Sequence, residues 1–163
     1  MDQRARVAGD PLLEDFVPHL TARLLAHDDQ TAALRFLEQM VDAVPESATV
    51  RLQLGELLLN RNDPTAAEPH LRAALQRDNE NAQGHFQLGN LLSRRRDLRT
   101  AATHYQRAVT LDADHADAHY QLGAVLFQLG DRDTAIDHFK RVVQLRPDDG
   151  NTHVNLGGIL ASQ

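Results

Sequence analysis

The sequence contains no cysteine and no tryptophan, and aromatic residues make up only 4% of its 163 positions. The lack of cysteine excludes disulfides, a thiolate nucleophile and cysteine-ligated zinc. It also fits a reducing compartment, so we expect a cytoplasmic protein. The scarcity of aromatic rings, in a chain rich in Ala and Leu, favours helices packed through small and aliphatic side chains over a β-sandwich.

Positive charge and long apolar runs are also missing. The formal net charge is −6, which leaves no global positive field to attract nucleic acid or an anionic membrane, so we expect neither as a partner. No apolar run approaches the ~20 residues that span a bilayer, and we see no apolar core of signal-peptide length near the start. The remaining balance, 42% hydrophobic and 25% charged, is typical of a soluble folded protein.

What the sequence does contain is an internal repeat of 34 residues. Its invariant glycines are Gly55, Gly89, Gly123 and Gly157. Aspartate and alanine keep the same interval at Asp29, Asp63, Asp97 and Asp131 and at Ala33, Ala67, Ala101 and Ala135. Such a period marks an array of helical repeats. We predict an N-terminal extension (1–13) and a single domain (14–163) made of a degenerate repeat (14–47), three repeats (48–81, 82–115, 116–149) and a half repeat (150–163).

The residue pattern within each repeat predicts two helices. Within 116–129, apolar residues three to four apart form one face; Asp131 is then placed to cap a second helix, which Pro147 ends. Glycine inside a helix costs about 1 kcal/mol relative to alanine, so a glycine in every first helix indicates that the two helices cross closely there. Pro69 falls inside a second helix, where we expect a lost backbone hydrogen bond and a local kink.

This period and residue set resemble the tetratricopeptide repeat family over residues 14–163. The motif is clearest at Leu122-Gly123, Leu126, Ala135, Phe139 and Pro147. The resemblance implies an all-α fold, a right-handed superhelical solenoid of antiparallel helix pairs. It also implies a non-catalytic scaffold, without a cofactor, that binds a peptide or helix of a protein partner in a concave groove. Where the family favours Trp, the chain departs from it with Arg51, His85, His119 and His153.

In the family, the first helix of each repeat lines the concave groove. The groove residues implied here are Leu52, Gln53, Glu56, Phe86, Gln87, Asn90, Arg94, Tyr120, Gln121, Phe127 and Asn155. Four of them form a row of amides in phase, and primary amides can both donate to and accept from an extended peptide backbone. The aromatic members would add apolar anchoring. The alternatives are that the amides only solvate the groove and that the rings pack inside their own repeats.

Other candidate sites favour ordinary structural roles. His115 and His119 have a spacing that can place two imidazoles on one helical face, but no third ligand is fixed, so we expect no metal site. The two families of in-phase histidines are interpreted as structural filler, and the run of arginines at 94–96 as solvated charge. No nucleotide-binding or nucleophile-elbow motif is present, so we predict no enzymatic activity.

Two further functions stay open. The chain would serve as the targeting arm of a larger enzyme, such as a glycosyltransferase or a sulfotransferase, if its final half repeat continued into further domains. Alternatively, it would self-associate through the C-terminal helix, because Leu156, Ile159 and Leu160 keep that helix apolar.

Overall fold

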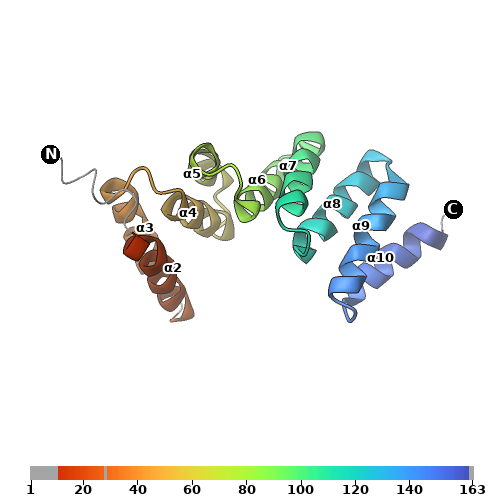
Figure 1. Cartoon of the computed structure of the whole chain (residues 1–163), viewed down its shortest axis with the longest axis horizontal. Coiled ribbons are helices and arrows are strands. Elements are labelled where there is room, and N and C mark those ends of the chain that lie inside the picture. Colours follow the sequence, from red (N-terminus) through yellow and green to blue (C-terminus); the bar gives the residue numbers. More distant parts are fainter. Residues whose placement is uncertain (1–10, 28, 162–163) are drawn as a thin grey trace. The chain divides into compact units, whose positions relative to one another are not determined.

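The computed structural model describes residues 11–27 and 29–161, and within these ranges the chain forms helices and no strands (Figure 1). The helices are α2 (Pro11–Ala26), α3 (Gln30–Ala43), α4 (Ala48–Asn60), α5 (Pro64–Arg77), α6 (Ala82–Arg94), α7 (Leu98–Leu111), α8 (Ala116–Leu129), α9 (Arg132–Leu145) and α10 (Gly150–Ala161). The predicted all-α helical repeat is confirmed.

The chain divides into two compact units, with the boundary between Glu80 and Asn81. Unit 1 holds α2–α5 and unit 2 holds α6–α10. We call α2, α4, α6, α8 and α10 the first helices, and α3, α5, α7 and α9 the second helices. Three of the first helices begin where the repeats were predicted to begin, at Ala48, Ala82 and Ala116, whereas α2 begins at Pro11, before the predicted repeat start at residue 14.

Every second helix begins at an aspartate cap. The capping carboxylates belong to Asp29, Asp63, Asp97 and Asp131, and each accepts a hydrogen bond from the backbone N–H three residues later, at 2.9–3.3 Å. Such caps satisfy backbone donors that have no partner inside the helix. The predicted capping role of Asp131 is therefore confirmed, and α5 continues through Pro69 to Arg77.

The in-phase glycines lie where a first helix crosses its second helix. A Cβ added to Gly55 would lie 2.6 Å from the Leu71 side chain, and one added to Gly89 would lie 2.7 Å from the Tyr105 ring. At Gly123 the nearest atoms, in the Phe139 ring and the Ala135 carbonyl, would be 3.2 Å away. The predicted close crossing is confirmed in all three pairs. α5, α7 and α9 thereby each bury one large side chain against a glycine.

Candidate functional site

In unit 1, a pocket of about 180 Å³ lies between the first helices α2 and α4. Its lining residues are Pro18, Thr21, Ala22, Leu25, Gln53, Glu56, Leu57 and Asn60. The Thr21 hydroxyl lies 2.8 Å from the Val17 carbonyl oxygen and 3.1 Å from Gln53 Oε1. Gln53 and Glu56, both predicted groove residues, therefore do border a cavity between two first helices.

In unit 2, a mostly polar pocket of about 200 Å³ lies between α6 and α8. We call it the polar pocket. It is lined by Asn90, Ser93, Arg94, Tyr105 and Gln121. Three of these five, Asn90, Arg94 and Gln121, are predicted groove residues.

The next pair of first helices, α8 and α10, encloses a larger cavity of about 330 Å³, which we call the apolar pocket. Its lining residues are Ala124, Phe127, Gln128, Phe139, Val154, Asn155, Gly158 and Ile159. Phe127 is 39% exposed and Val154 is 74% exposed. This part of unit 2 thus presents accessible apolar side chains around a hollow.

The two pockets of unit 2 are the same site in successive repeats. Residues Asn90, Ser93, Tyr105 and Gln121 of the polar pocket correspond, 34 positions later, to Ala124, Phe127, Phe139 and Asn155 of the apolar pocket. The fold therefore supplies a hollow at a fixed place between first helices. The variable residues around it change its chemistry from polar to apolar.

The amides that border these pockets are positioned by tyrosines. In the polar pocket the Tyr105 hydroxyl donates to Asn90 Oδ1 at 2.8 Å, and Asn90 Nδ2 donates to Gln87 Oε1 at 3.3 Å. Burial raises the pKa of the Tyr105 phenol, which keeps it protonated as a donor. In the apolar pocket, Asn155 Nδ2 donates to the Tyr120 hydroxyl at 2.9 Å. The amides are therefore fixed in place, a feature that the sequence pattern did not reveal.

The predicted aromatic and aliphatic groove residues are placed differently from one another. Phe86 is half-buried, with its ring centroid 4.8 Å from that of His115, and Tyr120 packs edge-on against Phe139 at 5.7 Å. Phe127 is the exposed member of the aromatic set. Leu52, which was also predicted to line the groove, is only 9% exposed and belongs to the core of unit 1.

The two histidine families meet in pairs inside unit 2. His85 Nδ1 lies 3.0 Å from His104 Nδ1, and His119 Nδ1 lies 2.9 Å from His138 Nδ1. The ring centroids of the second pair are 5.1 Å apart, so the two nitrogens point at each other as a hydrogen-bonded pair. Burial lowers the pKa of His119 and of His138, which favours their neutral forms. The interpretation of these histidines as structural filler therefore missed a specific contact, which joins α6 to α7 and α8 to α9.

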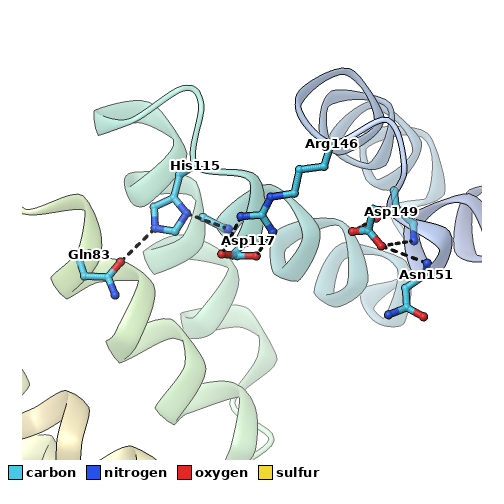
Figure 2. A network of polar contacts seen from close by, with 8 residues as sticks. Gln83, His115, Asp117, Arg146, Asp149 and Asn151 are labelled. Carbon is cyan, nitrogen blue, oxygen red and sulfur yellow. Dashed lines mark hydrogen bonds and ion pairs between the residues drawn. The ribbon is translucent and has the colours of Figure 1, made fainter. Parts of the chain in front are cut away.

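His115 stands apart from these pairs as the cap of α8 (Figure 2). Its Nδ1 accepts from the Ala118 N–H at 3.3 Å, which leaves Nε2 to donate to Gln83 Oε1 at 3.3 Å. Both ring nitrogens thus have protein partners, and within the described residues no group of three or more potential ligands gathers around a common point.

An ion pair links the start of α8 to the end of α9 (Figure 2). Arg146 donates to both carboxylate oxygens of Asp117, at 2.6 and 3.1 Å. The hydrogen bonds from Arg146 lower the pKa of Asp117. Asp149 accepts from the backbone N–H groups of Asn151 and Thr152 at the start of α10. The ion pair thus links α8 to α9, and Asp149 caps α10, the third helix that frames the apolar pocket.

Family profiles described as tetratricopeptide repeat match residues 24–85 and 86–150. The chain belongs to the tetratricopeptide repeat family. The predicted resemblance is confirmed, and with it a fold that supports protein interaction in general. None of the curated proteins matches the chain. In the part of the chain that the structure describes, no helix is both long and apolar enough to cross a membrane.

Solved structures with the same fold include MamA, which is 23% identical with a TM-score of 0.79, over 87% of this chain and 83% of that one. PilF of Pseudomonas aeruginosa is 20% identical with a TM-score of 0.81, over 99% and 71% of the two chains. YrrB, described as a tetratricopeptide repeat protein with an unusual peptide-binding site, is 20% identical with a TM-score of 0.72, over 90% and 75%. At these identities the likeness shows the fold.

Proposed function

We propose that the chain is a non-catalytic scaffold that binds a peptide segment of another protein along the first helices of unit 2. The observation that carries this proposal is the recurrence of a pocket at the same register in two successive repeats, once polar and once apolar. A second support is the family, whose fold is a protein-interaction scaffold. The peptide-binding site named for YrrB agrees with this kind of partner.

The two pockets suggest which peptide would fit. Packed helices lie about 8–10 Å apart, and an extended chain advances about 3.3–3.6 Å per residue. Three residues therefore span the separation of the two pockets, and a peptide in the polyproline II conformation, with three residues per turn, would direct side chains three positions apart into both. An acidic or amide side chain suits the pocket beside Arg94, and a large apolar side chain suits the one beside Phe127.

In this site, amide side chains such as that of Asn155 form hydrogen bonds with the main chain of the peptide. The hydrogen bond from Asn155 to Tyr120 uses one of its two N–H donors, and a primary amide also has an acceptor oxygen. Because the side chain is already oriented by the tyrosine, little side-chain entropy remains to be lost on binding. Preorganisation of this kind improves affinity.

The test is a selection from a library of random peptides displayed on phage, followed by affinity measurement with one selected synthetic peptide. Phe127→Ala should weaken its binding roughly tenfold, as the loss of a well-packed aromatic contact does. The matched control is Leu129→Ala, because Leu129 lies on the same helix, is also 39% exposed, and does not line the pocket. Equal losses in the two variants would contradict the proposed groove.

A further inference from the structure

A further pocket of unit 2 lies between the start of α8, the end of α9 and the start of α10. It is mostly polar and has a volume of about 270 Å³. Its lining residues are Ala116, Asp117, Tyr120, Gln121, Val142, Arg146, Asp149 and Asn151. We call it the Asp149 pocket, and Figure 2 shows its charged side chains.

In the preceding repeat, the place of this pocket holds an imidazole ring. The counterparts of Asp117, Tyr120 and Asp149, 34 positions earlier, are Gln83, Phe86 and His115. The His115 ring lies against the Phe86 ring, with centroids 4.8 Å apart, and its Nε2 bonds to Gln83 Oε1 at 3.3 Å. This register therefore accepts a planar N–H donor that packs on an aromatic side chain.

Aspartate at position 149 keeps the capping role of His115 but not its ring. The Asp149 carboxylate accepts hydrogen bonds from the backbone N–H groups of Asn151 and Thr152, at 3.1 and 3.3 Å. It also accepts from the Thr152 hydroxyl at 3.0 Å. Because aspartate has no ring to lie against Tyr120, the volume that the imidazole takes up one repeat earlier is left open here.

The charges that line the pocket favour a cation as the ligand. Arg146 donates to both carboxylate oxygens of Asp117, whereas these hydrogen bonds of Asp149 come from neutral donors. Two carboxylates and one guanidinium leave the lining with one negative charge in excess. A carboxylate offers about four lone-pair sites, so Asp149 can accept a further hydrogen bond from a ligand.

We propose that the Asp149 pocket binds the guanidinium group of an arginine in the partner peptide. A guanidinium is planar like the imidazole of the preceding repeat, packs on aromatic rings and presents a fork of N–H donors to carboxylates. A lysine ammonium lacks both the plane and the fork.

The identity of the partner rests on the proposed function, since the arginine belongs to the peptide in the groove. Tyr120 joins the two places, because its ring lines the Asp149 pocket and its hydroxyl accepts from Asn155 of the apolar pocket. One peptide can therefore place an arginine in the Asp149 pocket and a large apolar side chain in the apolar pocket.

The probe is N-acetylarginine N-methylamide, which carries the arginine side chain without charged termini. Titrated at millimolar concentration into the isotopically labelled full chain, it should cause saturable shifts of the backbone amide NMR signals of Asp117, Tyr120 and Asn151. The citrulline derivative keeps the shape without the charge, and the lysine derivative keeps the charge without the plane. Both should bind at least roughly fivefold more weakly, and equal binding of either would overturn the assignment to arginine.

The decisive variant is Asp149→Asn, which removes the charge and keeps a side-chain oxygen that can cap α10. It should weaken binding of the arginine derivative at least roughly fivefold while circular dichroism shows the chain still folded. The matched control is Asp148→Asn, because Asp148 is an exposed neighbour that does not line the pocket. Equal losses in the two variants would assign the binding to a general negative surface and overturn the proposal.

Asp149→His places the side chain of the preceding repeat in the pocket. Its Nδ1 can cap α10 as His115 caps α8, and its ring would take the space proposed for the guanidinium. It should abolish binding of the arginine derivative, and undiminished binding would overturn the proposal.

The same variant separates this proposal from the proposed function. Peptides selected from the phage library on the parent chain should carry an arginine, and those selected on Asp149→His should not. An equal frequency of arginine in the two sets would overturn the proposal even where Phe127→Ala weakens peptide binding. Binding of the arginine derivative that Asp149→His abolishes, without any peptide that needs Phe127, would support the pocket and contradict the groove.

Discussion

Among the described residues, three in the turns between first and second helices have a left-handed backbone, and only one of them is glycine. They are Asn62 (φ 61°), Arg96 (φ 65°) and Gly130 (φ 91°). Each precedes a capping aspartate whose N–H bonds back to a leucine carbonyl of the first helix, as Asp97 N–H does to Leu92 at 3.0 Å. This is the bonding pattern of a helix end that favours glycine in the left-handed position.

Arg96→Gly should therefore stabilise the chain. A side chain in the left-handed region costs about 1–2 kcal/mol, part of which the greater freedom of glycine in the unfolded state offsets. We expect the free energy of unfolding in urea to rise by about 0.5–1 kcal/mol. Arg95→Gly is the control, because Arg95 has φ −81° and gains no relief. An equal rise in both variants would show that loss of charge, and not backbone strain, is responsible.

At the scale of single residues, the sequence predicts the aspartate caps of the second helices but not the backbone strain at Arg96. Asp131 follows a glycine at the end of an apolar face, which is enough to predict a turn and a cap. Nothing about Arg96 predicts a left-handed backbone, since arginine is a good helix former. Arg96 adopts this conformation because the repeat fixes the position of the aspartate that follows it.

At the scale of helices, the contact between His119 of α8 and His138 of α9 links stability to pH. Their neighbours include Ala113, whose carbonyl lies 3.2 Å from His119 Nε2. The titratable groups around the pair are Arg141, His115 and Asp112 near His119, and Asp137 and Asp131 near His138. Burial is the largest influence on both rings, and it favours the neutral forms.

Acidification should therefore loosen this helix pair. Because the folded pKa values lie below the unfolded value of 6.5, the unfolded state takes up protons first as the pH falls. The stabilisation is complete above pH 6.5 and decreases below it, until the folded pKa values are passed. The thermal midpoint should thus fall between pH 7.5 and pH 5.

The contribution of the pair is isolated by comparing two variants over the same pH range. His119→Phe combined with His138→Leu should give a smaller fall of the thermal midpoint than the parent chain shows. His153→Phe is the control, because His153 is exposed and its Nε2 bonds to the Pro147 carbonyl rather than to a second histidine. A fall that the double variant leaves unchanged would assign the pH dependence to the carboxylates.

The sequence pattern predicts the helices better than the contacts between their side chains. The two histidine families are visible as a period, but their pairing depends on how closely the helices cross, which the glycines set. In unit 1 Arg51 stands where His85 and His119 stand in unit 2, and the Nδ1 atom of His70 is buried without a hydrogen-bond partner. The same register thus gives a different contact when one residue changes.

At the scale of the whole molecule, the period predicts one uninterrupted array, and the structure divides it after Glu80. The repeat stays in phase across that boundary, so the pattern gives no sign of the division. The family resemblance located the first helices as the lining of a groove, and Gln53, Gln121 and Asn155 do border pockets between them. It did not reveal that Leu52 is buried, because burial at that position depends on the size of the neighbouring side chains.

The end of unit 2 should be its least stable part. In a repeat array each helix is stabilised mainly by its neighbours, and within the described residues no second helix packs on Gly157 of α10 as α9 packs on Gly123 of α8. It also contains Gly157 and Gly158, and each helical glycine costs about 1 kcal/mol relative to alanine. In hydrogen exchange followed by mass spectrometry, the amides of α10 should exchange faster than those of α8.

Gly157→Ala with Gly158→Ala should slow that exchange, because a Cβ at either position meets nothing within 4 Å. Gly123→Ala, whose Cβ would lie 3.2 Å from the Ala135 carbonyl, should instead accelerate exchange in α8 and α9. If the alanines left α10 unchanged, its stability would depend on docking against α9 and not on the helix itself.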